Sequence, residues 1–187
     1  MDAAIDVAAA RRLGITVSGT GGAVTPTVEH TWALILGLQR HLVTEDQRIR
    51  DGLWQSTVGS DLHGATLGLV GVGRIGSRVA AIGTAFGMNV IGWSPNLTEE
   101  RAAEAGVIRV ERDALFAGSD VVSLHMVLAG STRGLVGATE LAAMKPTAWL
   151  INIARGTVVD EAALVELAAP GLAAPAARGH HRPVPGP

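Results

Sequence analysis

Apolar residues along this chain follow two kinds of spacing, and the change between them divides the sequence. From Pro26 the apolar positions recur at helical spacing, which predicts a long helix to about Arg50 with Thr25 as its N-cap. From Thr66 onward, short apolar runs alternate with segments of helical character, and the runs predict buried strands at 66–70, 89–93, 120–124 and 148–153. Strands that alternate with helices predict an α/β domain built on a parallel sheet.

The two ends of the chain differ from this middle part. Residues 3–13 suit a short helix that Gly14 ends, and residues 15–20 suit a strand. Near the other end, Asp160 is expected to start a last helix that runs to about residue 168. The stretch 169–187 has no periodicity, holds five of the eight prolines and no acid, and is typical of a disordered tail.

Composition favours a folded chain with no charge-driven partner. Apolar residues make up 48% and charged residues 17%, and the formal net charge of −2 argues against binding nucleic acid. There is no cysteine, which excludes disulfides and thiol chemistry, and the six histidines show no metal-ligand spacing. No apolar run approaches the ~20 residues of a membrane span, and no signal peptide is recognisable. We therefore expect a cytoplasmic protein that binds no metal, membrane or nucleic acid.

A glycine-rich turn, "GVGRIG", lies between a predicted strand and a predicted helix. Gly71 permits a tight turn, Gly73 lets the backbone approach a pyrophosphate, and Gly76 lets the helix pack on the strand. The helix N-terminus adds free N–H groups and the positive end of a dipole. This context predicts a dinucleotide site, and the alternative is a plain turn in a chain with 24 glycines.

Ser94 stands at the end of the second strand, where an acid often binds the adenosine ribose hydroxyls. A serine removes the charge that would repel a 2′-phosphate, but no arginine beside it would attract one. NAD is therefore favoured, and NADP stays open. Two interpretations of Ser94 also stay open, since it can donate a hydrogen bond to the ribose or can be a plain turn residue.

With the segment "INIARGTVVDEAAL" (151–164) added, residues 3–168 resemble the D-isomer-specific 2-hydroxyacid dehydrogenases. Other matching segments are "TVEHTWALILGLQR", "RDGLW", "FGMNVIGW" and "SDVVSLHMVLAGSTRGLVG", in the family's order. The resemblance implies a Rossmann-type doubly wound parallel sheet. Its dinucleotide-binding domain would be 26–168 with a leading long helix, after a remnant of the second, substrate domain at 1–25. The tail, 169–187, suggests a frameshift or a premature end.

The resemblance also implies NAD as cofactor, a small 2-oxo or 2-hydroxy acid as substrate, and a homodimer. The cofactor-binding residues it implies are Gly71, Gly73, Arg74, Ile75, Gly76, Ser94, Met126, Thr132, Ile153 and Ala154. In this assignment Arg74 and Ile75 present backbone N–H groups to the pyrophosphate. Met126 lies near the adenosine side, whereas Ile153 and Ala154 line the nicotinamide end.

Arg155 corresponds to the catalytic arginine of that family. It follows a buried strand, at the edge where open α/β sheets bind ligands. A guanidinium offers a planar fork that fits the carboxylate of a 2-oxo acid, and it can polarise the carbonyl as hydride arrives. The alternative is an arginine that forms an ion pair with Asp160 or Glu161.

The resemblance requires a proton-relay histidine with a glutamate beyond residue 168, and neither is expected here. His180 and His181 lack an acidic neighbour, His125 is expected to be structural, and His30, His41 and His63 are expected at the surface or an interface. The expected function is an NAD(P)-dependent oxidoreductase that transfers hydride between nicotinamide and a 2-oxo or 2-hydroxy acid, impaired in this chain. The alternatives are an NAD(P)-binding module and a decayed gene product, both without turnover.

Overall fold

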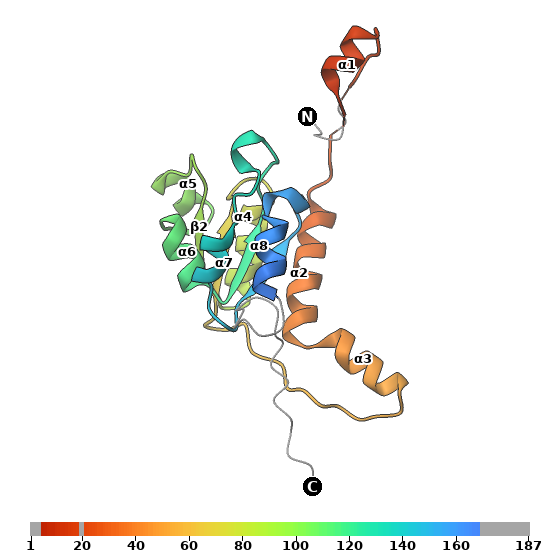
Figure 1. Ribbon diagram of the computed structural model, residues 1–187. Helices are drawn as coiled ribbons and strands as arrows, with labels where there is room; N and C mark the ends of the chain where they lie inside the picture. The colour runs from red at the N-terminus through yellow and green to blue at the C-terminus, as the bar shows by residue number, and fades with distance from the viewer. Residues whose placement is uncertain (1–4, 19–20, 169–187) are drawn as a thin grey trace.

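The structure is a computed structural model that describes residues 5–18 and 21–168. Helices and strands alternate through most of this length, as Figure 1 shows. The elements are α1 Val7–Arg12, α2 Thr25–Gln39, α3 Leu42–Arg50, β1 Thr66–Val70, α4 Gly76–Ala85, β2 Asn89–Trp93, α5 Glu99–Glu104, β3 Ile108–Arg109, α6 Arg112–Gly118, β4 Val121–Leu124, the 3₁₀ turn η1 Gly130–Thr132, α7 Ala138–Ala143, β5 Trp149–Asn152, the 3₁₀ turn η2 Gly156–Val158, and α8 Glu161–Ala168.

The strands of the described residues form one parallel sheet in the order β3-β2-β1-β4-β5. β1 lies at its centre, where Leu67 pairs with Val90 of β2 on one side and with Val121 of β4 on the other. This is the strand order of dinucleotide-binding sheets, in which the chain winds outward in both directions from the first strand. The predicted Rossmann-type α/β fold is confirmed.

Both faces of the sheet are covered, which explains why its strands are apolar nearly throughout. Leu67 and Leu69 of β1 belong to the core beneath α2 and α4, whereas Val70 belongs to the core beneath α6, α7 and α8. All three side chains are fully buried. Alternate residues of a strand point to opposite faces, so a strand between two helical layers needs apolar residues at every position.

The single long helix predicted for 26–50 is wrong. The chain forms α2 and α3 instead, separated by His41, whose φ of 52° lies in the left-handed region. α2 buries one face, with Val28, Trp32 and Ile35 against the sheet, but α3 buries no residue. Apolar spacing continues across the break, and spacing alone does not reveal one residue with a left-handed backbone.

Smaller differences concern the ends of elements and the segment that forms β3 and α6. Residues 15–18 form no strand, α2 begins at Thr25 with Val24 as its N-cap, and β3 and α6 were not predicted. The predicted caps of α5 and α8 are confirmed, since Thr98 accepts from Arg101 N and Asp160 from Ala163 N. The prediction for the tail 169–187 lies outside the described residues, and the domain division at 25/26 stays a prediction.

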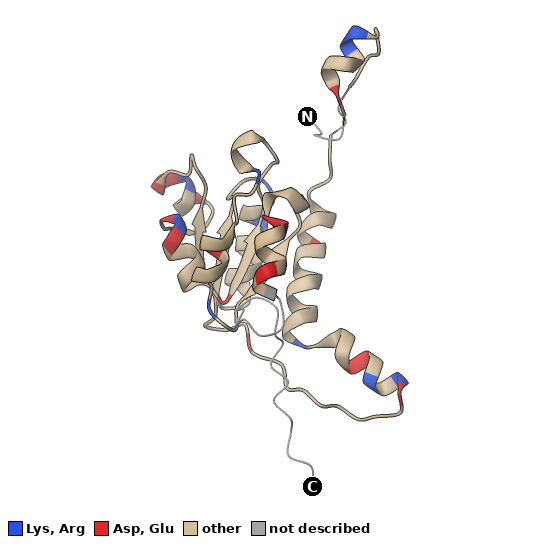
Figure 2. Cartoon of the chain, in the orientation of Figure 1, with Lys and Arg blue, Asp and Glu red and all other residues tan. Residues whose placement is uncertain are grey.

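No helix in the described ranges combines the length and the apolarity that crossing a bilayer requires. In the same ranges, no three His, Asp or Glu side chains come together as a metal site. Acidic and basic residues are interspersed over the helices and are not gathered by sign (Figure 2).

Candidate functional site

The candidate site lies at the carboxyl edge of the sheet, where the loops after β1, β2, β4 and β5 meet. Parallel strands bring these loops to one edge, and the predicted site residues all lie in or beside them. The winding direction reverses between β1 and β4, which leaves a crevice at that edge in folds of this type. The structure therefore gathers residues that are far apart in the sequence into one region.

Each of the three glycines in the turn after β1 has its own relation to the fold. Gly71 has φ 105°, and a Cβ there would lie 3.0 Å from the backbone of His125. A Cβ on Gly76 would overlap the carbonyl oxygen of Gly71, so only glycine lets α4 start this close to β1. A Cβ on Gly73, in contrast, would meet no atom within 4 Å. The fold does not require glycine at position 73, whereas a ligand that approaches the backbone there would.

Backbone N–H groups of this turn are free to bind such a ligand. Gly71 N donates to Trp93 O at 2.8 Å, and Val72 N donates to Ser94 Oγ at 3.2 Å. Within the described part of the chain, the N–H groups of Gly73, Arg74 and Ile75 have no acceptor. They precede the first turn of α4, where the helix dipole also favours a negative charge. The turn thus offers three donors to one anionic group.

Ser94 takes part in a turn, and its side chain also contacts the glycine turn. Its carbonyl oxygen accepts from Leu97 N at 3.1 Å, which makes it part of a turn. Its hydroxyl accepts from Val72 N, so the side chain lies against the glycine turn and keeps its own proton for a second partner. Arg101, which was not predicted from the sequence, contacts the turn that starts at Ser94, since its Nη1 donates to Asn96 O at 3.2 Å.

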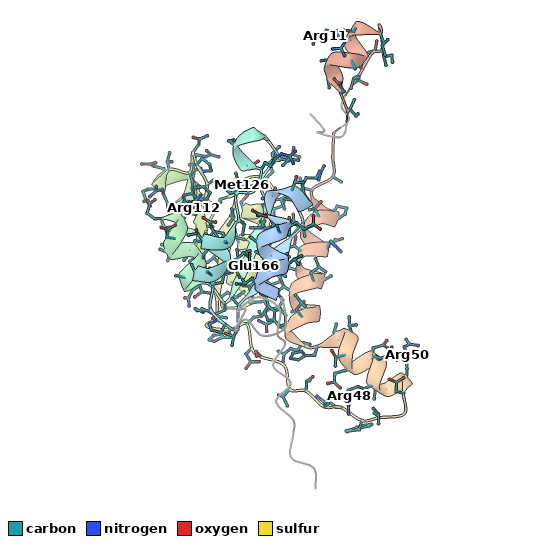
Figure 3. The ribbon with its side chains drawn as sticks, in the orientation of Figure 1. Arg11, Arg48, Arg50, Arg112, Met126 and Glu166 are labelled. Atoms are coloured by element: carbon teal, nitrogen blue, oxygen red, sulfur yellow. The ribbon has the colours of Figure 1, made fainter. Side chains whose placement is uncertain are left out.

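The loop after β4 lies beside the glycine turn and starts with a half-buried histidine, His125, whose ring nitrogens are both buried. Burial lowers the pKa of His125 from 6.5 to about 4, and in the described chain neither ring nitrogen has a hydrogen-bond partner. The expected structural role of His125 agrees with its position beneath Gly71 and Gly76. The next residue, Met126, is half-buried (Figure 3). Its sulfur packs so close to the glycine turn that a Cβ on Gly71 would lie 3.0 Å from it.

Thr132 is buried and shapes this same loop. Its hydroxyl accepts from Ala129 N at 2.8 Å and donates to Val127 O at 2.7 Å. These bonds close the segment 127–132 into a compact turn. The hydroxyl of Thr132 therefore makes its hydrogen bonds within the loop. Its direct contact with the cofactor stays a prediction.

Arg155 lines a cavity of about 470 Å³ at the end of β5. The other lining residues are Pro26, Thr27, His30, Asn152, Ile153, Ala154 and Gly156. The guanidinium donates to Ala154 O at 2.9 Å, and the described residues contain no ion pair between Arg155 and Asp160 or Glu161. The alternative of a paired surface arginine is therefore not supported, and the guanidinium keeps most of its donors for a ligand.

Two residues of this cavity were missed in the sequence. Asn152 holds the loop that carries Arg155, because its Nδ2 donates to Arg155 O and its Oδ1 accepts from Ala154 N, both at 3.0 Å. A polar residue that ends a buried strand was the available signal. His30 reaches the cavity from the first turns of α2, which packs against β5. No local pattern connects these two segments, so His30 was expected only as a surface or interface residue.

Comparison with known families gives one match over most of the chain. The model described as "D-isomer specific 2-hydroxyacid dehydrogenase, NAD binding domain" matches residues 32–179. The match includes the glycine turn, the loop after β4 and Arg155. It also extends into the stretch that was predicted to be a frameshifted tail.

Individual relatives agree with this family. A glyoxylate reductase from Aeropyrum pernix is 44% identical over 183 residues, which cover 92% of this chain and 55% of that protein. A D-3-phosphoglycerate dehydrogenase from Synechocystis sp. is 38% identical over 86% of this chain and 30% of its own length. The chain therefore spans about half, or less, of the relatives that it matches.

Solved structures give the same result. The phosphoglycerate oxidoreductase from Vibrio cholerae O395 superposes with a TM-score of 0.85 at 35% identity, over 90% of this chain and 55% of that one. The D-lactate dehydrogenase from Aquifex aeolicus, solved with NAD and lactic acid, gives a TM-score of 0.79 at 34% identity, over 89% of this chain and 51% of its own. Sequence and fold thus select the same group of proteins.

Proposed function

The chain belongs to the D-isomer specific 2-hydroxyacid dehydrogenase family, whose NAD-binding domain it contains, and from this premise we propose its function. We propose that it binds NAD and serves hydride transfer between the nicotinamide and a small 2-oxo or 2-hydroxy acid. The observation that carries this proposal is the position of Arg155, at a cavity on the same sheet edge as the glycine turn. A guanidinium with free donors is suited to a carboxylate.

The turn after β1 would hold the dinucleotide through its pyrophosphate. The open space at Gly73 and the free N–H groups of Arg74 and Ile75 fit a phosphate that approaches the start of α4. Ser94 would donate its hydroxyl proton to a ribose oxygen while it accepts from Val72 N. Met126 would lie near the adenosine side and Thr132 near the cofactor, whereas Ile153 and Ala154 would line the nicotinamide end.

When bound, NAD supplies or accepts the hydride, and the protein supplies position and charge. Arg155 would bind the carboxylate of the acid and polarise its carbonyl, because negative charge grows on the carbonyl oxygen as hydride arrives. Asn152 would fix the loop that carries Arg155. Both residues follow β5, so a rigid strand sets their distance from the cofactor.

A second function, NAD binding without turnover, is supported by a different observation. The glycine turn has all the groups that a pyrophosphate needs, whereas Arg155 is the one member of the reacting set assigned among the described residues. Turnover with glyoxylate or hydroxypyruvate separates the two functions. Cofactor binding without turnover would support the binding module.

Replacing Gly73 with alanine is expected to weaken NADH binding by at least tenfold, because the new methyl group would occupy the space of the approaching phosphate. The measurement is the dissociation constant from NADH fluorescence, with unfolding in urea measured in parallel. Gly118→Ala is the matched control, since a Cβ there makes ordinary contact at 3.9 Å in α6. Unchanged affinity in Gly73→Ala, or no NADH binding by the unmodified chain, would contradict the proposed cofactor site.

Replacing Arg155 with lysine is expected to weaken binding of oxamate, an unreactive 2-oxo acid analogue, about tenfold in the presence of NADH. Lysine keeps the charge but loses the planar fork that binds a carboxylate through two parallel bonds. Calorimetric titration of oxamate measures the change. Arg11→Lys in α1, which stands apart from the sheet in Figure 3, is the control. If both variants bind oxamate as the unmodified chain does, Arg155 does not hold the substrate.

The proposed partner is a second copy of the chain, because α3 and the segment after it expose many large apolar side chains. These are Leu42, Val43, Ile49, Leu53, Trp54 and Val58. A monomer seldom exposes so much apolar surface in one element. A homodimer formed through α2 and α3 would cover it. The cytoplasmic location stays a prediction.

A further inference from the structure

Three methionines lie in the described part of the chain, and one of them differs from the others in its surroundings. Met88 is 6% exposed and Met144 3% exposed, each within an apolar core. Met126 is half-buried instead, and it packs at the margin of the core beneath α6, α7 and α8 (Figure 3). Oxidation of a methionine depends on access of the oxidant to the sulfur. Met126 is therefore the described methionine that an oxidant reaches most easily.

The backbone on both sides of Met126 is held in place. On one side, His125 N donates to Val70 O at 2.8 Å, which continues the pairing of β4 with β1. On the other side, Val127 O accepts from the Thr132 hydroxyl at 2.7 Å. Because both neighbours are hydrogen-bonded, the loop cannot easily carry the side chain of Met126 away from the glycine turn.

The sulfur of Met126 lies against the first glycine of that turn. A Cβ on Gly71 would lie 3.0 Å from this sulfur, so the contact has no room for a further atom. Oxidation to the sulfoxide adds an oxygen to the sulfur and makes an apolar side chain polar. That oxygen would point into the contact with Gly71, into the apolar core, or out to the carboxyl edge of the sheet.

Each of these three directions disturbs the turn that would hold the cofactor. In the contact with Gly71 the oxygen would displace the turn, and in the core it would be a polar group without a partner. At the carboxyl edge it would place partial negative charge beside the bound pyrophosphate. Gly73, whose N–H group is free in the described chain, follows Gly71 by two residues, which separates their Cα atoms by less than ~8 Å. At this distance two negative groups repel each other.

We propose that Met126 is an oxidation site through which a peroxide weakens cofactor binding. The sulfur lone pair attacks one oxygen of hydrogen peroxide, and the S–O bond forms as the O–O bond breaks. The departing hydroxide takes the proton from the transferred oxygen and leaves as water, so the sulfur loses two electrons and the peroxide gains them. A methionine sulfoxide reductase reverses the change at the expense of a thiol. The inference rests on the cofactor site proposed above.

The test exposes the purified chain to hydrogen peroxide, removes the peroxide, and measures two quantities in the same sample. Peptide mapping by mass spectrometry gives the oxidised fraction of each methionine, and NADH fluorescence gives the dissociation constant of the cofactor. Met126 is expected to gain one oxygen atom before Met88 and Met144 do. The dissociation constant is expected to rise about fivefold as Met126 is oxidised. Treatment with methionine sulfoxide reductase should restore it.

Met126→Leu and Met144→Leu are the matched variants, since each replaces one thioether by an apolar side chain of similar volume. The quantity compared is the ratio of the dissociation constants after and before peroxide, so a different starting affinity does not affect the comparison. Met126→Leu should lose the rise. Met144→Leu should show the same rise as the unmodified chain, because its buried thioether is not the one that reacts.

Unfolding in urea is measured on the oxidised chain in parallel, because loss of the fold would also abolish NADH binding. Global unfolding on oxidation, or oxidation of Met88 or Met144 ahead of Met126, would overturn the inference. NADH binding that oxidation of Met126 leaves unchanged would overturn it as well, while the cofactor site would stand. If the unoxidised chain binds no NADH, the proposed cofactor site is wrong, and this inference with it.

Discussion

Replacing Gly76 with alanine is expected to lower the free energy of unfolding by about 3 kcal/mol, the upper end of what overpacking costs. The added Cβ would overlap the carbonyl oxygen of Gly71. The Cβ is held rigidly on its own Cα and the oxygen belongs to the backbone, so no rotation can make room. α4 would have to move from β1, and Val79 and Ala80, which it buries against the sheet, would move with it.

Urea denaturation followed by tryptophan fluorescence measures this change. The control is Gly73→Ala, three residues earlier in the same turn, where the added methyl group meets no atom within 4 Å. This control is expected to change the free energy of unfolding by less than about 0.5 kcal/mol. Equal losses in both variants would mean that the turn is looser than its contacts indicate.

The sequence motif alone treats its three glycines alike, and the structure separates them. Gly71 and Gly76 are required by the fold itself, through a positive φ and through the contact of α4 with β1. At Gly73, in contrast, no contact within the described chain requires a glycine. A pattern of letters contains no distances, so it could predict a dinucleotide site but could not divide its residues between folding and binding.

Local signals explain why most of the sheet was predictable. Each strand is a short apolar run because both of its faces are buried, and most connecting helices begin or end at a glycine, a proline or a polar cap. The break at His41 has no such signal, because histidine commonly occupies helices and nothing in the neighbouring residues requires a left-handed backbone. The separation of α3 from α2 could therefore be found only in the three-dimensional structure.

The cavity at Arg155 depends on packing between elements from opposite ends of the described chain. α2 lies against β5, and this contact brings His30 and Thr27 to the loop that Asn152 holds. Arg155 was predicted from the family resemblance and from its place after a buried strand, but neither argument could pair that strand with a helix so far away. Sites of this kind are predictable where one element carries them and not where two elements meet.

His125 is expected to make the stability of the domain depend on pH. Burial lowers its pKa from 6.5 in the unfolded chain to about 4 in the folded one. Between these values the unfolded chain binds the proton and the folded chain does not, so the free energy of unfolding falls as the pH falls. One pH unit corresponds to about 1.4 kcal/mol, so the loss between pH 6.5 and pH 4 is about 3 kcal/mol from this residue.

The variant that tests this is His125→Leu, which removes the ionisable group while it keeps the position filled. Both ring nitrogens lack partners in the described chain, so the apolar side chain costs little at pH 7. Its free energy of unfolding should fall about 2 to 3 kcal/mol less than that of the unmodified chain when the pH is lowered from 7 to 4.5. His30→Gln, which removes an exposed imidazole, should follow the unmodified chain. Parallel curves for His125→Leu and the unmodified chain would show that the His125 ring is hydrated or paired beneath the glycine turn, because only a neutral, dry imidazole produces the difference.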